Sequence, residues 1–166
     1  MQRTLLYSLL FIGQLVFGQS QPNAYDEMLN EYYKRTVPFI QPDQLNKKMN
    51  ANEKILLLDT REKGEFAVSS LKGAINVGFL TFSKSEVDAV DKSTKIVVYC
   101  TIGARSETIG EKLIKLGFTN VYNLYGGIIL WKNQGYPVYL KDKPTEYVHV
   151  YSKKWGAWLT NGKPKY

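Results

Sequence analysis

The sequence has little from which to build a disulfide framework or a metal site. Its 166 residues contain one cysteine, Cys100, and one histidine, His149. A lone cysteine excludes an intramolecular disulfide, and the two residues together leave no cysteine-rich or histidine-rich set of zinc ligands. We therefore expect no metal and no cofactor, so that any chemistry relies on side chains and backbone groups.

The sequence also lacks a hydrophobic run long enough to cross a membrane. Leu5–Phe17 is a mostly apolar run of 13 residues, whereas a spanning helix needs about 20. Arg3 precedes the run, and Val16 and Gly18 place small side chains at the −3 and −1 positions of a cleavage site. These features predict a signal peptide over residues 1–18 that is cleaved near Gly18. We expect an exported protein, periplasmic or extracellular, with no stable membrane span.

The composition excludes a disordered chain and indicates one globular domain with appendages. Hydrophobic residues make up 44% of the chain and charged residues 22%, which is ordinary for a protein with a packed core. Much of the net charge of +7 lies between Lys141 and Tyr166, where six lysines face two acidic residues. Basic and aromatic residues together are typical of nucleic-acid binding. Because the protein is predicted to be exported, we expect no nucleic-acid partner.

Short apolar runs alternate with amphipathic segments along most of the chain. Strands are predicted over 55–58, 73–77, 95–99 and 120–124, of which 55–58 and 95–99 are typical of buried strands, and 37–40 is a further short apolar run. The segments that predict helices are 23–34, 42–49, 106–116 and 128–134. A weakly helical connection is expected over 79–90, and a charged stretch over 61–69 with Phe66 as its anchor. Alternating strands and helices predict an α/β fold with a largely parallel sheet.

The predicted elements divide the chain into four parts. Residues 1–18 are the signal peptide, 19–41 a helical arm, 42–138 the main domain and 139–166 a basic, aromatic extension. In the extension, Trp155, Trp158 and Leu159 share the spacing of one helical face. We expect this face to pack on the domain, against the arm's helix over 25–33. The alternative is a docking surface for a partner or an anionic envelope surface.

The segment most suggestive of chemistry is Lys95–Ser106. A buried strand delivers Cys100 to its carboxyl end, where open parallel sheets bind ligands. A loop with Gly103 and Arg105 follows, and then a helix begins. Backbone N–H groups of such a loop and the positive end of the helix favour a thiolate, and the guanidinium can bind an anion. We therefore interpret Cys100 as a reactive thiol rather than a small core side chain.

With these residues the chain resembles the rhodanese family over about 42–138. The matching stretches are Leu58–Glu62, Glu65–Phe66, Lys72–Asn76, Cys100–Ser106, Leu116–Phe118 and Leu124–Gly127, with Trp131 behind them. The resemblance depends on their order and spacing together. It implies a rhodanese-like α/β fold, with a central, mostly parallel sheet flanked by helices.

The resemblance also implies a sulfurtransferase. Cys100 would be the catalytic residue that carries a persulfide, and the loop would bind the substrate through the Arg105 side chain and its backbone amides. The residues that supply the amides are Thr101, Ile102, Gly103, Ala104, Arg105 and Ser106. The implied partners are a small anionic sulfur donor such as thiosulfate or a persulfide, and a thiol or cyanide acceptor or a partner protein. Many relatives place a histidine where this chain has Ser70, which puts fine positioning in doubt more than activity.

The sequence of this loop also allows other functions. Related phosphatases and arsenate reductases separate cysteine and arginine by five residues, whereas four lie between Cys100 and Arg105, so the loop suits sulfur better than phosphate. A cysteine–histidine dyad would require the tail with His149 to fold back over the site. A binding module without catalysis, serving a partner protein in the cell envelope, is the alternative of a different class.

One further pair has two interpretations. Asp59 and Arg61 match the family's Asp-x-Arg pattern. They either shape the rim of the active site or form a buried ion pair, and we expect the ion pair.

Overall fold

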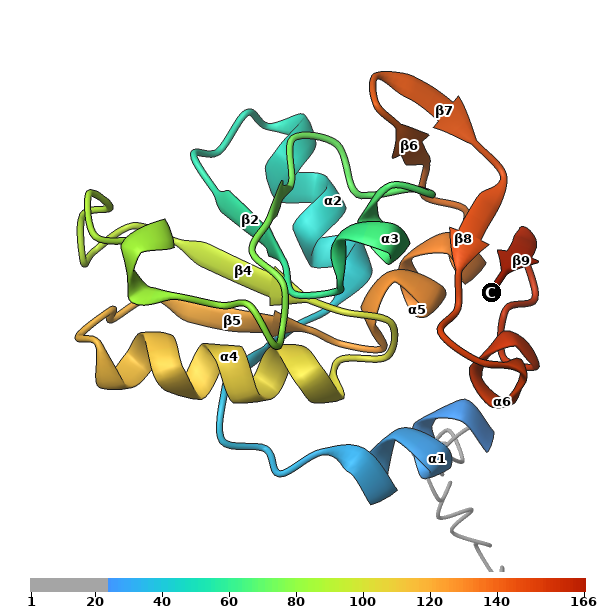
Figure 1. The fold of residues 1–166 in the computed structure, drawn as a ribbon, viewed down its shortest axis with the longest axis horizontal. Helices are drawn as coiled ribbons and strands as arrows, with labels where there is room; N and C mark the ends of the chain where they lie inside the picture. Colours follow the sequence, from blue (N-terminus) through green and yellow to red (C-terminus); the bar gives the residue numbers. More distant parts are fainter. Residues whose placement is uncertain (1–23) are drawn as a thin grey trace, which may run out of the picture.

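A parallel five-stranded sheet forms the centre of the computed structural model, which describes residues 24–166. Its strand order is β1-β5-β4-β2-β3, and every recorded pairing is parallel (Figure 1). The strands are β1 (Phe39–Ile40), β2 (Leu56–Asp59), β3 (Ile75–Asn76), β4 (Ile96–Tyr99) and β5 (Val121–Leu124). The predicted α/β fold with a mostly parallel sheet is therefore confirmed.

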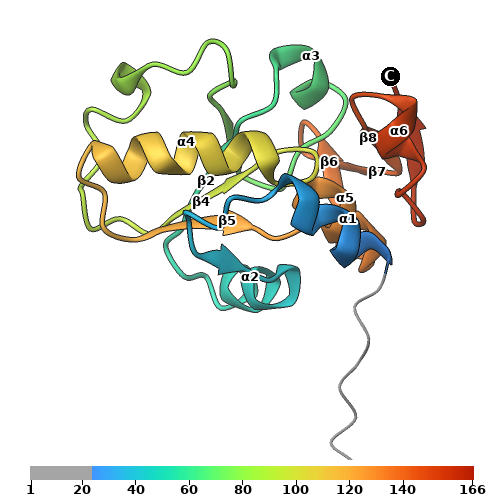
Figure 2. The same cartoon turned by 90° about the horizontal axis from the view of Figure 1, so that it is seen from below.

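Helices cover both faces of this sheet. They are α1 (Ala24–Tyr32), α2 (Pro42–Asn50), α3 (Lys63–Phe66), α4 (Ala104–Lys115), α5 (Gly127–Asn133) and α6 (Lys153–Gly156). Figure 2 shows α2 and α4 on opposite sides of the central strands. As predicted, α2 opens on Pro42, whose missing N–H is not needed in a first turn.

Alternation along the strands divides the hydrophobic core in two. Leu57 and Val97 pack in the cluster that includes α1, α2 and α5, whereas Leu58 and Val98 pack in the cluster that includes α4. Successive side chains of a strand point to opposite faces. Both faces of the central strands are covered, which explains why β2 and β4 include continuous runs of buried apolar residues.

Two local predictions differ from the structure. The connection 79–90 forms only a single 3-10 turn, η1 (Lys84–Glu86). The Ser83 hydroxyl accepts a hydrogen bond from the Ser85 amide there, a local bond that competes with helix. In α3 the buried side chain is Glu65, and Phe66 is only half-buried. Phe66 is therefore not the anchor of that stretch.

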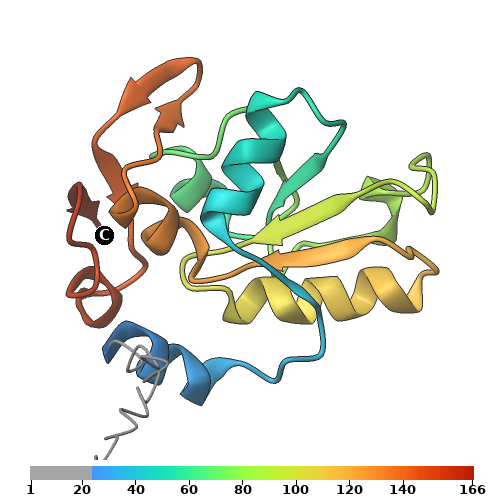
Figure 3. The same ribbon diagram turned by 180° about the vertical axis from the view of Figure 1, so that it is seen from behind.

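The C-terminal extension folds back onto α1. It begins within the antiparallel pair β6 (Val138–Leu140) and β7 (Lys143–Thr145) and contains the parallel pair β8 (Tyr147–His149) and β9 (Lys163–Lys165). Its tryptophans meet the tyrosines of α1, with ring centroids 5.4 Å apart for Tyr25–Trp158 and 5.0 Å for Tyr32–Trp155. Figures 1 and 3 show α6 and α1 side by side. The predicted packing of this face against the arm's helix is confirmed.

The predicted signal peptide, residues 1–18, lies outside the described residues. Within residues 24–166, no helix is long and apolar enough to cross a membrane.

Asp59 and Arg61 form the buried ion pair that the sequence suggested. The Arg61 guanidinium donates to Asp59 Oδ2 at 2.6 Å, and both side chains are fully buried. Arg61 also donates to the Ser69 carbonyl at 2.6 Å. The pair therefore ties the end of β2 to the chain that follows α3.

Removing one member of this pair should cost far more stability than removing an exposed charge. In Asp59→Asn a buried guanidinium loses its counter-charge, a change that costs about 3–5 kcal/mol. The control is Asp43→Asn, because Asp43 pairs with Lys47 on the exposed side of α2, where a pair contributes about 1 kcal/mol or less. Urea unfolding of both variants measures the difference. Equal losses would show that the buried pair adds nothing beyond an exposed one.

Candidate functional site

Cys100 lies directly after β4, at the carboxyl end of a central strand. Its side chain is 1% exposed. The Gly103 N–H donates to Cys100 Sγ at 3.2 Å, and α4 begins at the next residue. Gly103 has φ of 100°, a conformation that glycine adopts without a steric penalty. The sulfur thus accepts a backbone hydrogen bond beside the positive end of a 12-residue helix.

The carbonyl groups of this loop are bound by groups outside the pocket, and the Gly103 N–H is the loop amide that contacts the sulfur. Amides at the start of α5 donate to Cys100 O at 2.9 Å and to Thr101 O at 3.2 Å. The Tyr33 hydroxyl donates to Ile102 O at 2.6 Å. The Asn123 side chain donates to Gly103 O at 2.8 Å. Every carbonyl from position 100 to 103 therefore has a partner outside the pocket.

Arg105 is held by a carboxylate rather than pointing freely into the loop. Its two terminal nitrogens donate to the two oxygens of Glu65 at 2.8 and 2.7 Å, and one of them also donates to Thr101 Oγ1 at 3.0 Å. A bidentate pair of this kind fixes the plane of the guanidinium. Arg105 therefore has a set orientation before any substrate arrives, and part of its charge is already balanced.

The same pair changes the ionisation of Glu65. Burial of this carboxyl opposes its charge, but the hydrogen bonds and charge of Arg105 outweigh burial, and the pKa of Glu65 is lowered from its ordinary value. Glu65 is thus ionised near neutral pH and supplies the negative partner that Arg105 needs.

Cys100 lines a small pocket of about 180 Å³. Its floor is the loop, through Cys100, Thr101, Ile102, Ala104 and Arg105. Its other walls come from outside the main domain, as Tyr32, Tyr151 and Trp155. The extension and the N-terminal arm thus complete the site.

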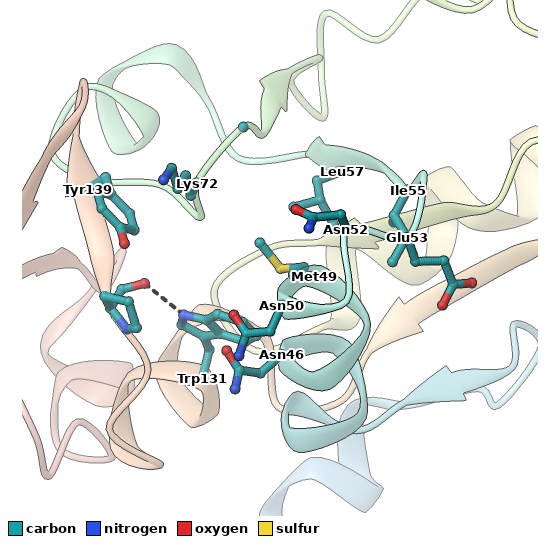
Figure 4. A pocket seen from close by; sticks show the side chains of 12 residues that line it. Asn46, Met49, Asn50, Asn52, Glu53, Ile55, Leu57, Lys72, Trp131 and Tyr139 are labelled. Carbon is teal, nitrogen blue, oxygen red and sulfur yellow. Dashed lines mark hydrogen bonds between the residues drawn. The ribbon is translucent and has the colours of Figure 1, made fainter.

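A larger hollow of about 590 Å³ lies elsewhere, between α2 and the chain around β6. Figure 4 shows Met49 and Asn50 of α2 on one side of it and Tyr139 and Lys72 on the other. Cys100 does not line this hollow. The larger of these two hollows therefore does not contain the reactive cysteine.

The loop residues named from the sequence do not all face the pocket. The Ser106 side chain is fully buried, and its hydroxyl lies 3.0 Å from Gly103 O and 2.7 Å from Asn123 Oδ1. Its hydroxyl therefore supports the loop, and its side chain does not line the pocket. Gly103 acts through its amide on Cys100.

The sequence predicted no role in the site for Glu65, nor for the three aromatic side chains that line the pocket. A signal for Glu65 was present, because the charged stretch after β2 begins at the sheet edge where Cys100 lies. The aromatic walls had no such signal, since their place depends on how the extension folds.

The tail does fold back over the site, which the sequence made a condition for a cysteine–histidine dyad. The recorded contacts of His149, however, are to other groups. Its Nδ1 accepts the Tyr151 N–H at 3.1 Å and lies 4.0 Å from Glu65 Oε1. Burial lowers the pKa of His149, which favours the neutral ring. His149 thus belongs to the Glu65–Arg105 surroundings.

Comparison with known proteins identifies the domain. Residues 41–134 match the family model of the rhodanese-like domain. The chain belongs to the rhodanese-like domain family. A sulfurtransferase of Allochromatium vinosum is 30% identical over 99 residues, which covers 60% of this chain and 92% of that protein.

Other relatives of this rhodanese-like chain are longer. The tRNA uridine(34) hydroxylase of Buchnera aphidicola is 33% identical over 125 residues, which are 70% of this chain but only 38% of that protein. The chain therefore spans less than two-fifths of the first curated relatives that it matches.

Solved structures show the same fold. A rhodanese-related protein from Thermoplasma volcanium has a TM-score of 0.53 at 30% identity, covering 63% of this chain and 99% of that one. The thiosulfate sulfurtransferase of Pseudomonas aeruginosa has a TM-score of 0.60 at 22% identity, covering 70% of this chain and 22% of that one.

The rhodanese-like loop should be sensitive to a side chain at Gly127, the first residue of α5. Gly127 has φ of 57°, and an added Cβ would lie 2.5 Å from Cys100 O. Strain at such a position, with the contact, predicts that Gly127→Ala lowers the free energy of unfolding by about 2 kcal/mol or more. The matched control is Gly64→Ala in α3, where an added Cβ meets nothing within 4 Å. Denaturant unfolding of both variants would contradict this if Gly127→Ala proved as harmless as Gly64→Ala.

The Glu65–Arg105 pair predicts a dependence of stability on pH. The pKa of Glu65 is lower in the folded state than its ordinary value of 4.5. The ionised carboxylate therefore stabilises the fold above that value, and this contribution is lost as the pH falls through the folded pKa. We expect the stability difference between the wild type and Glu65→Gln to be largest near pH 7 and to shrink below about pH 4.5. Urea unfolding at a series of pH values measures it, and a constant difference would contradict the assignment.

Proposed function

We propose that this protein is a sulfurtransferase that moves a sulfane sulfur through a persulfide on Cys100. The donor is thiosulfate or another persulfide, and the acceptor is a thiol or cyanide. The observation that carries this proposal is the hydrogen bond from the Gly103 N–H to Cys100 Sγ at the N-terminus of α4. A group placed there stabilises negative charge on sulfur both before and after the transfer.

The first half-reaction loads the cysteine. The Cys100 thiolate attacks the outer sulfur of thiosulfate and forms a new S–S bond. The S–S bond of thiosulfate breaks, and sulfite leaves with its electron pair. The terminal sulfur of the persulfide then carries the negative charge, next to the loop amides from Thr101 to Ser106. Gly103 is the one whose N–H the geometry already places on the sulfur.

The second half-reaction removes the terminal sulfur from the Cys100 persulfide. Cyanide or a thiolate attacks the terminal sulfur and forms a bond to it, and the Cys100 thiolate leaves with the electron pair of the broken S–S bond. The acceptor departs as thiocyanate or as a persulfide. Donor and acceptor bind in turn to one site, so ping-pong kinetics are expected. Arg105, fixed by Glu65, positions positive charge at the pocket for the anionic donor.

We further propose export to the periplasm or the extracellular space, on the basis of the apolar run and small residues within positions 1–18. The sulfurtransferase relative, matched over 92% of its length, supports the activity class. The similarity to tRNA uridine(34) hydroxylases covers only 38% of those proteins, so we do not extend their RNA substrate to this chain.

Replacement of the nucleophile should abolish the transfer. We expect the wild type to release sulfite from thiosulfate, to form thiocyanate from cyanide, and to gain about 32 Da, one sulfur atom, on Cys100 after thiosulfate alone. Cys100→Ser should react at the rate of the solution without protein and gain no mass. Ser85→Ala, at an exposed residue of η1, is the control and should behave as the wild type.

Other results would favour the alternatives. Equal sulfite release by the wild type and Cys100→Ser would overturn the proposal. A folded protein that forms no persulfide with several donors would instead support a binding module without catalysis. Turnover of an aryl phosphate that is lost in Cys100→Ser would support a phosphatase.

A further inference from the structure

Three aromatic side chains from outside the matched family region cover the Cys100 loop. Tyr32 ends α1, Tyr151 follows β8, and Trp155 lies in α6. All three line the pocket that contains Cys100, although the family model matches only residues 41–134. We call these three side chains the aromatic roof.

The roof is held in place by its own contacts. The rings of Tyr32 and Trp155 meet edge to face with centroids 5.0 Å apart, and Lys154 Nζ donates to the Tyr32 hydroxyl at 2.6 Å. On either side of His149, Val148 and Val150 are fully buried in the core. Tyr32 and Trp155 are therefore half-buried and packed on each other, whereas Tyr151 is 60% exposed beside the pocket.

Tyr151 occupies a strained backbone conformation in this roof. Its φ is 66°, in the left-handed region that costs a residue with a Cβ about 1–2 kcal/mol. Its N–H donates to His149 Nδ1 at 3.1 Å, and its ring lies 5.0 Å from the Arg105 guanidinium carbon. Such a conformation persists only where the surrounding contacts hold it. Here it places an aromatic ring over the side chain that faces the substrate.

The roof limits what can reach the sulfur by size. The pocket of about 180 Å³ is below the roughly 300–1,000 Å³ of sites for drug-sized ligands. A cysteine of another protein would have to bring its Cα within about 9 Å of the Cys100 Cα, which is the upper span of a disulfide plus one S–S bond. Because Cys100 is only 1% exposed and the three rings line the pocket beside it, we expect them to obstruct that approach, whereas a small anion or thiol needs no backbone beside it.

The charges around the pocket favour small anions. Arg105 lines it, with part of its charge balanced by Glu65, and Lys154 adds a positive charge nearby, 4.9 Å from the Trp155 ring centroid. Positive groups at the opening of a pocket raise the local concentration of anions. Size and charge thus select the same class of substrate.

We propose that the aromatic roof determines specificity: it admits small anionic donors and low-molecular-weight acceptors to Cys100 and excludes cysteines carried by other proteins. This inference rests on the proposed function for its chemistry, but its size selection concerns access to Cys100 alone. Tyr151 and Trp155 are the residues that set the limit.

The access step can be measured without any sulfur transfer, because Cys100 is the only cysteine of the chain. Intact mass follows its alkylation by iodoacetamide and by a maleimide carried on a polyethylene glycol chain. Reacting groups held even ~1 Å from contact lose about 100-fold in rate. Relative to a free cysteine, we therefore expect the wild type to react about 100-fold more slowly with the large reagent than with the small one.

Two variants remove the roof in different ways. Trp155→Ala deletes the wall from α6. Tyr151→Gly deletes the ring and suits the left-handed backbone, so this variant retains the fold. Each should raise the rate with the large reagent and change the rate with the small one little. The control is Tyr147→Ala, since Tyr147 is an aromatic residue of the same extension that does not line the pocket.

The same proteins, loaded with sulfur by thiosulfate, then transfer it to cyanide or to reduced thioredoxin. We expect the wild type to transfer sulfur to cyanide much faster than to thioredoxin. The roof variants should raise the thioredoxin rate relative to the cyanide rate by about tenfold or more, because they remove part of the barrier to access that the roof imposes. A role in stability alone would lower both rates together and leave their ratio unchanged.

The outcomes separate the two proposals. Two results would overturn the proposal that the roof limits access to Cys100. One is equal alkylation of the wild type by both reagents, and the other is an unchanged ratio of the cyanide rate to the thioredoxin rate in folded Tyr151→Gly. Size-selective alkylation with no persulfide after thiosulfate overturns the sulfurtransferase and supports the roof as a filter for access to Cys100.

Discussion

The site depends on one constraint: the backbone of the Cys100 loop must hold the Gly103 N–H on the sulfur. A loop can do this only if its carbonyl groups find partners on the other side, because a buried carbonyl without a hydrogen bond costs about 1–3 kcal/mol. Here those partners come from α5, from Tyr33 in the N-terminal arm and from Asn123 in β5. The sheet, the arm and the glycines that open α5 therefore serve the same small group of atoms.

Charge is arranged around this loop in two buried or half-buried pairs. Asp59 and Arg61 join the end of β2 to the chain after α3, and Glu65 of α3 binds Arg105 of α4. The first pair positions α3, and the second uses that position to orient the guanidinium beside Cys100. An ion pair that looks structural thus helps to set the geometry of a side chain that lines the Cys100 pocket.

The extension and the arm change the site from an open loop at a sheet edge into a small, partly aromatic pocket. Their rings pack on each other, with Tyr25 against Trp158 and Tyr32 against Trp155. This packing buries apolar surface that each segment would otherwise expose to solvent. The same packing places Trp155 beside the loop. The contacts that hold the extension on the arm therefore also give the pocket its aromatic lining.

Much of the fold could be predicted from the sequence, because its signals are local. Apolar runs of four or five residues define the strands, Pro42 marks the start of α2, and the position of Cys100 after Tyr99 follows from the end of a strand. The sequence was less informative where local hydrogen bonds compete with helix, as in the segment around Ser83, and where burial reverses expectation. Glu65 is buried and Phe66 is only half-buried, because Arg105 provides a partner that cannot be read from α3.

By itself, then, the sequence determined the parallel α/β sheet, the thiol at the end of β4 and the helix that follows it, since each depends on residues close together in the chain. Only the tertiary structure decided which carboxylate holds Arg105, which groups bind the loop carbonyls and which side chains cover Cys100. Those contacts join residues far apart, such as Tyr33 with Ile102 across 69 positions and Lys154 with Tyr32 across 122. Periodicity and propensity describe how a segment folds, but such contacts arise only when the whole chain packs together.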